Sequence, residues 1–274
     1  MHPLSVIIIT YNEEAHISRC IRSVRKVADE IIVLDSYSQD GTVQLARELG
    51  AAVYFEKFRG YIGQKNLATQ LASNNYILSL DADEALDEVL VNSILQAKKK
   101  FTSRLYTMNR CSNFNGKPIR HGLWYPDRKI RLFDRRIAKW GGANPHDKIV
   151  SQKEFKPEHL KGDIQHYSHD SIEDMVEQNN KLSTIAAASQ YAAGKRSSWF
   201  KLFIHPVWAF MNGYFFKRGF LDGLDGFNIA VNNAHQVFMK YCKLARLQQK
   251  KQTTKTPSLV LPIERDIKPL VSER

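Results

Sequence analysis

The chain has 274 residues, 43% of them hydrophobic and 25% charged, so it can bury a large core and is not a disordered segment. Its three cysteines show no paired spacing and no histidine partner, which argues against a disulfide framework or a zinc site. The formal charge of +12 is consistent with partners that carry negative charge. The N-terminus lacks the basic flank and cleavage site of a signal peptide, so we expect a cytoplasmic protein.

The first hundred residues alternate strand-like and helix-like patterns. A β-branched run at 5–9 precedes a segment in which Ile17, Ile21 and Val24 recur at helical spacing, and Asn12 is placed to cap that helix. The alternation continues with predicted strands at 31–34, 51–55 and 76–80 and predicted helices at 42–49, 66–72 and 87–100. Repeated βα units of this length predict a mostly parallel sheet that is covered on both faces.

After residue 100 the pattern changes. Short alternating segments at 105–109 and 129–133, with a turn at 115–117, predict an antiparallel extension with one exposed face. The rest of the chain predicts three helices and then a loosely ordered polar tail, at 171–193, 199–216, 222–247 and 248–274. We find no internal repeat.

An acidic cluster follows the apolar run at 76–80. Asp81, Asp83 and Glu84 would emerge at the carboxyl end of a buried strand, where ligands collect in parallel α/β sheets. Carboxylates at this place suit a hard divalent cation that is shared with substrate phosphates. The alternative is that Asp83 and Glu84 begin or cap the helix that follows.

The C-terminal part is basic and aromatic. Between residues 195 and 255 the chain has eleven Lys or Arg against two acidic residues, and ten aromatic side chains lie between 199 and 227. The longest uncharged piece, 202–216, contains Pro206 and is shorter than the roughly 20 residues that span a bilayer. This composition favours helices that rest on an anionic lipid surface. The alternatives are a core-packing cap with a solvated basic face and an oligomer interface.

An ordered series of motifs at 5–13, 33–36, 40–42, 63–66 and 81–84 resembles the GT-A domain of family 2 inverting glycosyltransferases. Segments at 131–133, 140–142, 146–147 and 219–223 resemble its narrower branch of lipopolysaccharide inner-core β-1,4-glucosyltransferases. The resemblance implies an α/β fold of the GT-A Rossmann-like kind, a mostly parallel sheet with an antiparallel extension and a C-terminal helical region. It also implies a UDP-sugar donor and Mg²⁺ or Mn²⁺. The domains would be a nucleotide-sugar half (1–100), an acceptor-side half (101–170), a membrane-proximal helical region (171–247) and the tail.

In such a fold the donor binds to the first half. The resemblance assigns nucleotide-sugar contacts to Thr10, Tyr11, Asn12, Glu13, Asp35, Lys65, Asp81 and Ala82, and the metal to Asp83 and Asp81. Tyr11 would lie against the uracil ring, Asp35 would accept from the base or ribose, and Lys65 would face the pyrophosphate. The alternatives are ordinary helix caps at Asn12 and Asp40, and a solvated lysine at position 65.

The acceptor side requires a base opposite the leaving group. The resemblance gives this role to Asp147, although similar enzymes have His-Glu where this chain has His146-Asp147. Diphosphate or an anionic acceptor would be bound by Arg128, Arg131 and His146, but the two arginines have opposite parity on a strand, so they need not face the same side. His166 and His169 are further candidates for metal or phosphate contacts.

We therefore expect a metal-dependent inverting hexosyltransferase that glucosylates a heptose of the lipopolysaccharide inner core and associates peripherally with the inner membrane. A polyprenyl-phosphate or capsule acceptor is an alternative. A basic nucleic-acid-binding module is another, but an acidic triplet at the expected site would repel a polyanion. The sequence leaves the oligomeric state open.

Overall fold

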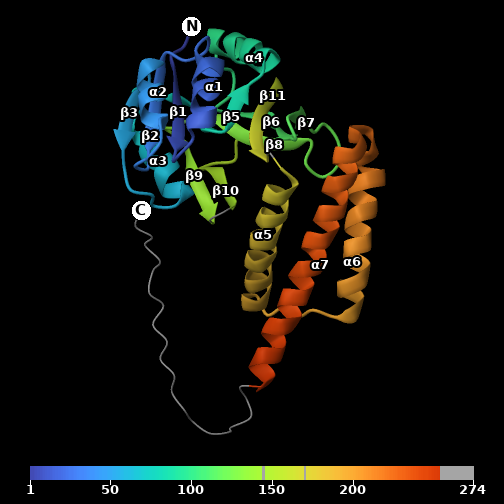
Figure 1. Cartoon of the computed structure of the whole chain (residues 1–274). Coiled ribbons are helices and arrows are strands. Elements are labelled where there is room, and N and C mark those ends of the chain that lie inside the picture. Colours follow the sequence, from blue (N-terminus) through green and yellow to red (C-terminus); the bar gives the residue numbers. More distant parts are fainter. Residues whose placement is uncertain (144–145, 170, 254–274) are drawn as a thin grey trace, which may run out of the picture.

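The structure, a computed structural model, describes residues 1–143, 146–169 and 171–253. A nine-stranded mixed sheet lies at its centre with helices on both faces, and long helices extend from one side of it (Figure 1). The strand order is β3-β2-β1-β4-β8-β6-β11-β5, with β7 paired to β6. The expected fold class, a mostly parallel sheet at the N-terminal side with an antiparallel extension and C-terminal helices, is confirmed.

The first half is built from βα units as predicted. Its elements are β1 (Leu4–Thr10), α1 (Glu14–Val24), β2 (Glu30–Asp35), α2 (Thr42–Glu48), β3 (Ala52–Phe55), α3 (Tyr61–Leu71) and β4 (Tyr76–Asp81). Strand β1 is buried along its whole length because it lies between β2 and β4 and is covered on both faces. Its register pairs Thr10 with Asp35 and Ile9 with Asp81, so the carboxyl ends of three parallel strands meet at one edge.

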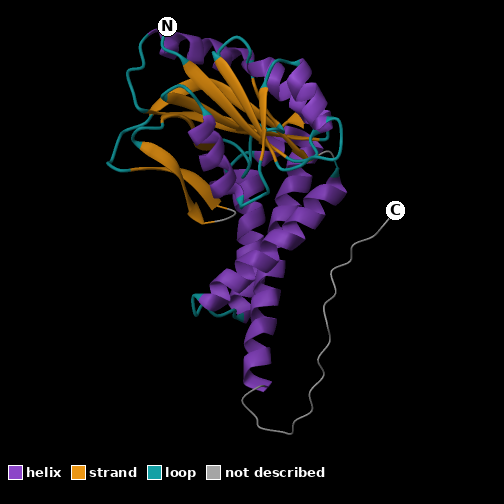
Figure 2. Ribbon diagram, turned by 90° about the vertical axis from the view of Figure 1, so that its left-hand side faces the viewer, coloured by secondary structure: helices purple, strands orange, loops and turns teal. Residues whose placement is uncertain are grey.

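The second half adds antiparallel strands. Its elements are β5 (Glu84–Leu86), α4 (Glu88–Lys99), β6 (Leu105–Phe114), β7 (Lys117–Pro118), β8 (Asp127–Asp134), β9 (Ala138–Ala143), β10 (His146–Ser151) and β11 (Glu158–His169). Strand β8 runs antiparallel between β4 and β6, and β9 and β10 form a separate two-stranded sheet (Figure 2). The predicted turn at 115–117 joins β6 to β7, with Asn115 and Gly116 at positive φ.

One alternative and one helix boundary drawn from the sequence were wrong. Asp83 and Glu84 do not cap the following helix, because β5 intervenes and Asp87 accepts the cap hydrogen bond from the Leu90 amide at 2.7 Å. The third helix begins at Tyr61 rather than at residue 66. Gly60, at φ +81°, makes the turn into this helix, so residues 61–65 are helical as well.

A β-bulge at Arg131 changes which residues share a face of β8. Tyr106 pairs with Leu132 and Thr107 with Ile130, so Arg131 is the extra residue. An extra residue inverts the alternation beyond it. Four consecutive residues, Arg128 to Arg131, line one cavity, so both arginines reach it although they have opposite parity in the sequence.

The C-terminal helices form an arm below the sheet (Figure 2). They are α5 (Ile172–Ala192), α6 (Trp199–Met211), a π-helical turn η1 (Asn212–Phe216), a 3₁₀ turn η2 (Gly219–Asp222) and α7 (Gly223–Thr253). Helix α7 packs between α5 and α6, with Ala187, Tyr241 and Leu244 buried in their shared core. Helix α7 continues past the predicted end at 247 to Thr253, and residues 254–274 of the predicted tail lie outside the described residues. Among the described residues, no helix is both long and apolar enough to cross a bilayer.

Candidate active site

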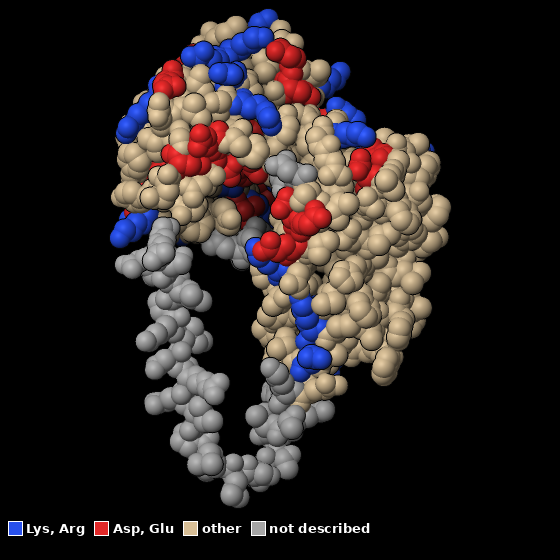
Figure 3. Space-filling model, viewed as in Figure 1, with Lys and Arg blue, Asp and Glu red and all other residues tan. Residues whose placement is uncertain are grey.

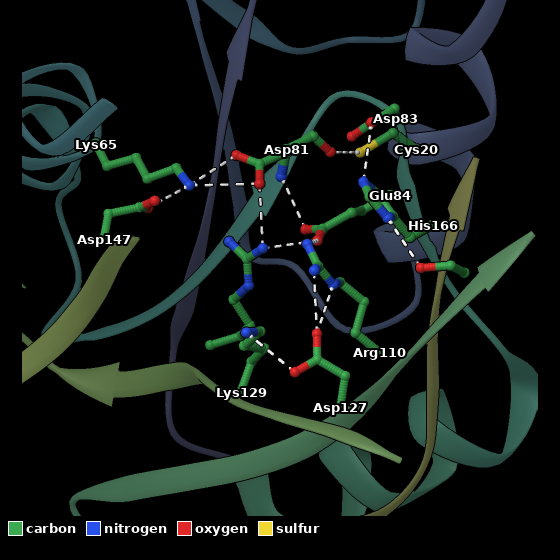
Figure 4. A network of polar contacts seen from close by, with 12 residues as sticks. Cys20, Lys65, Asp81, Asp83, Glu84, Arg110, Asp127, Lys129, Asp147 and His166 are labelled. Atoms are coloured by element: carbon green, nitrogen blue, oxygen red, sulfur yellow. Dashed lines mark hydrogen bonds and ion pairs between the residues drawn. The ribbon is translucent and has the colours of Figure 1, made fainter. Parts of the chain in front are cut away.

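Lys65 joins two carboxylates that come from different parts of the fold. Its ammonium nitrogen lies 2.9 Å from Asp81 Oδ1 at the end of β4 and 2.9 Å from Asp147 Oδ2 on β10 (Figure 4). The lysine side chain is only 4% exposed, so the alternative of a solvated helix lysine was wrong. The structure thus brings three predicted site residues, Lys65, Asp81 and Asp147, into direct contact.

Arg131 is the second cation that contacts Asp81, after Lys65. Its Nη2 lies 3.1 Å from Asp81 Oδ2 and 2.6 Å from Oε1 of the fully buried Glu84. The other Glu84 oxygen accepts from the Asp81 amide at 3.0 Å. Burial by itself would raise the pKa of Asp81, but the positive charges of Arg131 and Lys65 outweigh it and hold that pKa far below its usual value. Asp81 is therefore a carboxylate already neutralised by two cations.

The cavity in front of this network has a volume of about 540 Å³. Within the described residues, buried Nε and Nη1 of Arg131 and Nε1 of Trp140 have no hydrogen-bond partner. The Trp140 ring also packs against cations, with Lys65 Nζ 4.4 Å and the Arg131 guanidinium carbon 5.5 Å from its centroid. Unused buried donors are costly, so the cavity is built for a ligand that supplies oxygen acceptors.

Further basic side chains line the same cavity. Arg110, Arg128, Lys129 and Lys148 add to Lys65 and Arg131, against the acidic Asp81 and Asp147 among the lining residues. Arg110 and Lys129 are both paired to Asp127, at 3.0 Å each. This excess of positive charge favours an anionic ligand such as a diphosphate.

Asp83 points in a different direction from Asp81. Its Oδ2 lies 3.1 Å from Nε2 of His166 on β11, and the carboxylate is 23% exposed (Figure 4). No group of three or more His, Cys, Asp or Glu with metal-binding geometry occurs among the described residues. Mg²⁺ and Mn²⁺ in phosphate-transfer sites are held by one or two protein ligands together with phosphates and water, so an Asp-His pair with an open side fits such an ion. Asp81 fits less well because both of its oxygens face cations.

A second cavity, of about 520 Å³, opens beside the first at the β1 and β4 strand ends. Four of the residues proposed for the nucleotide-sugar, Thr10, Tyr11, Glu13 and Ala82, line it together with Gln64, Phe58 and Tyr61. Within the described part of the chain, buried Thr10 Oγ1 and Gln64 Oε1 have no hydrogen-bond partner. Exposed Tyr11 and Tyr61 offer ring faces to a planar group. The cavity suits a base and ribose.

The remaining donor-side residues shape the loop instead. Asn12, at φ +53°, accepts from the Gln39 amide at 2.8 Å, so the expected N-cap was wrong. The Asp40 carboxylate, which lies on a different loop, accepts from the Glu14 amide in the first turn of α1 at 3.1 Å. It also accepts from the Thr42 hydroxyl. Fully buried Asp35 accepts from Ser38 with both oxygens, at 2.8 and 2.5 Å.

Two predicted residues have no described side chain. His146 is placed in β10 and His169 in β11 by their backbones, but their side chains lie outside the described part of the structure. No role is therefore assigned to either of them.

The sequence model described as "Glycosyl transferase family 2" matches residues 5–155, more than half of the chain. The chain belongs to glycosyltransferase family 2. An uncharacterized glycosyltransferase of Rickettsia typhi is 32% identical over 100% of this chain and 97% of its own. The lipopolysaccharide core biosynthesis glycosyltransferase LpsC of Rhizobium meliloti is 31% identical over 88% of this chain and 92% of its own.

The solved structures that match this family 2 glycosyltransferase superpose on it with low TM-scores. S. aureus TarS (residues 1–349) shares 15% identity over 91% of this chain and 92% of that chain, at a TM-score of 0.42. Glucosyl-3-phosphoglycerate synthase of Mycobacterium tuberculosis, solved with Mn²⁺ and UDP-glucose, shares 22% identity over 41% of this chain and 44% of that chain, at 0.35. At these TM-scores the likeness carries no functional argument.

Sequence reasoning missed several residues of this glycosyltransferase site. Glu84 looked like a helix cap, Arg110 was not singled out, and Gln64 and Trp140 were noted only as parts of motifs. Gln64 could have been predicted as a site residue, because it lies next to Lys65 in the motif at 63–66. Nothing local marks Arg110, because its neighbours Asp127 and Glu84 become adjacent only in the folded sheet.

Proposed function

We propose that the protein is an inverting hexosyltransferase that moves a hexose, glucose in the first instance, from a UDP-sugar to a membrane-anchored glycolipid acceptor of the lipopolysaccharide inner core. The observation that carries the proposal is the single lysine between Asp81 and Asp147. It joins the strand end that faces the nucleotide cavity to a carboxylate on a separate hairpin. Donor and acceptor groups can therefore meet in one cavity.

The chemistry is a displacement at the anomeric carbon. Asp147 accepts the proton of the acceptor hydroxyl, the acceptor oxygen bonds to the anomeric carbon, and the bond from that carbon to the diphosphate oxygen breaks with inversion. Lys65 and Arg131 neutralise the charge that develops on the departing UDP. The Arg131 and Trp140 donors that have no partner among the described residues bind oxygens of the diphosphate or sugar.

Asp83 and His166 would hold Mg²⁺ or Mn²⁺ at the donor phosphates, and Asp81 would act mainly through its ion pairs. When bound, such an ion supplies further neutralisation of the leaving diphosphate. Thr10, Gln64 and Tyr11 would bind the nucleoside in the neighbouring cavity. Asp35 and Asp40 would keep the intervening loops in place through Ser38 and Thr42.

The arm supports a lipid-anchored acceptor. We define the α6 apolar face as eleven side chains of α6 and the turns that follow it, up to the start of α7, each 45% or more exposed: Trp199, Phe200, Phe203, Ile204, Val207, Trp208, Phe215, Phe216, Phe220, Leu221 and Leu224. No side chain of α6 is buried, and Figure 3 shows this side of the molecule almost free of charged residues. Residues 195–221 contain five Lys or Arg and no acidic residue, which opposes a second copy and favours an anionic lipid surface.

The direct test is transfer. Purified protein is incubated with a panel of UDP-hexoses and with truncated lipopolysaccharide, a polyprenyl phosphate or a capsule intermediate, and the products are separated by mass spectrometry. We expect transfer to the truncated lipopolysaccharide and an inverted linkage by NMR. Transfer confined to another acceptor class, or retention of the anomeric configuration, would refute the proposal. The named relative LpsC, a lipopolysaccharide core enzyme by its name, makes this acceptor the first choice.

A further inference from the structure

A third cavity, of about 380 Å³, is lined by residues of β6, β8 and β11 and of helices α5 and α7. Figure 1 shows these two helices running down from the sheet below β6 and β8. Much of its wall comes from helices beyond residues 5–155, the part of the chain that the family model matches. Much of this cavity therefore lies outside the part of the chain that the family model matches.

The cavity adjoins the candidate active site. Arg110 lines both this cavity and the one in front of Asp147. His166, the partner of Asp83, lines it as well, and its other ring nitrogen lies 3.4 Å from Ser112 Oγ. A ligand that extends from the reaction cavity past Arg110 therefore enters this third cavity.

Its chemistry differs from that of the reaction cavity. Four amide side chains line it, together with Trp124: Gln178, Asn179, Asn233 and Gln236. Within the described part of the chain, the exposed Gln178 and the half-buried Asn233 and Gln236 make no side-chain hydrogen bond to another protein group, so their amides are available to a ligand. The charged pair on its wall, Arg110 and Asp127, is mutually neutralised at 3.0 Å.

Amides both donate and accept, as sugar hydroxyls do, and an aromatic ring packs against the C–H face of a pyranose. Among the described lining residues, Arg110 is the only Lys or Arg, whereas the reaction cavity has six, so this wall favours an anion far less; an apolar ligand would leave the amides without partners. We propose that this cavity binds a neutral sugar unit of the acceptor, next to the unit that receives the hexose. The proposal rests on the proposed function and adds to it that the enzyme reads at least two units of its acceptor.

The test compares acceptors of different length. Asn233→Ala and Gln236→Ala are assayed with a monosaccharide acceptor and with the oligosaccharide released from deacylated, heptose-terminated lipopolysaccharide. Loss of about one hydrogen bond should raise the KM for the oligosaccharide about five- to tenfold, while the KM for the UDP-sugar and the KM for the monosaccharide stay unchanged. Gln190→Ala is the matched control, because Gln190 lies on α5 outside the cavity.

An unchanged oligosaccharide KM in both variants, or an equal change for the monosaccharide, would overturn the inference. Calorimetric titration of the oligosaccharide without donor separates it from the proposed function. If the wild-type protein binds the oligosaccharide and both variants bind it several-fold more weakly, the cavity is a sugar site even when no transfer is detected. If transfer occurs and the variants bind like the wild type, the inference alone fails. Thermal melts check that both variants fold.

Discussion

Asp147 Oδ2 lies 2.9 Å from Lys65 Nζ, although the two residues are 82 positions apart in the chain. The contact links the short β9–β10 sheet to a helix that covers the main sheet. It holds the candidate base at the reaction cavity before any substrate arrives. A base fixed in this way loses little conformational freedom when the acceptor binds.

The Asp147→Asn variant tests the base directly. The amide keeps the shape of the side chain but cannot take the proton of the acceptor hydroxyl. We expect kcat to fall by about 10²- to 10⁴-fold, with UDP binding in the presence of Mn²⁺ nearly unchanged by calorimetry. Asp147→Glu, which restores a longer carboxylate, should retain more transfer than Asp147→Asn. Full activity in Asp147→Asn would exclude this residue as the base.

Lys65→Met should weaken both the site and the fold around it. The change leaves Asp81 and Asp147 without their shared cation, so we expect about a tenfold or greater loss of UDP-sugar affinity and a lower Tm. Lys26→Met is the matched control, because that lysine is 65% exposed and its ion pair within the described residues is with the exposed Glu88. Equal donor affinity in the two variants would show that Lys65 does not contact the diphosphate.

Metal dependence should follow Asp83 and His166. EDTA should abolish transfer and Mn²⁺ should restore it. His166→Ala should lower the affinity for Mn²⁺ in the presence of UDP by about 10- to 100-fold, measured by electron paramagnetic resonance. His159→Ala, on the same strand but exposed, should bind Mn²⁺ like the wild type. Mn²⁺ binding that survives Asp83→Ala would place the ion elsewhere.

Asp134 should give the fold a measurable acid sensitivity. Burial alone would raise its pKa, but hydrogen bonds from Arg136 and Arg104 hold that pKa below its usual value. A lowered pKa in the folded state adds stability above the unfolded pKa of about 4, and this stability is lost as the pH falls through the folded pKa. Asp134→Asn should therefore lower the Tm at pH 7 by about 5 °C.

The same variant should differ less and less from the wild type as the pH falls from about 4 through the lowered folded-state pKa of Asp134, below which the wild type has lost the charge as well. Scanning calorimetry across this range checks the trend. Glu154→Gln, at an exposed position, should leave the curve unchanged. A constant Tm difference at all pH values would mean that packing, and not charge, is what Asp134 contributes.

The α6 apolar face should bind anionic vesicles. Trp199 and Phe200 are 77% and 66% exposed, so the variant with both changed to serine should bind phosphatidylglycerol vesicles about tenfold or more weakly in a flotation assay. Wild-type binding should fall as salt is raised, because part of it is electrostatic. Val89→Ser removes an exposed apolar side chain on α4 and should change nothing. Wild-type protein that forms a dimer and ignores vesicles would identify this face as an oligomer interface.

Local patterns in the sequence were enough to determine the order of the elements. Strand β1 was recognisable because a buried parallel strand is apolar throughout, and α1 because Ile17, Ile21 and Val24 repeat at helical spacing. The acidic residues after β4 also predicted a site, because the carboxyl ends of parallel strands share one edge. These features depend on neighbours within a few residues.

Only the tertiary structure decided which charges meet. The bulge at Arg131 turns this residue toward Asp81 and Glu84. The sequence of β8 contains no pattern that predicts an extra residue at this position. The contacts of Lys65 with Asp147 and of Asp83 with His166 likewise join segments about 80 residues apart. Such pairs form when the whole sheet packs, because the energy of a buried charge depends on every side chain around it and not on its place in the sequence.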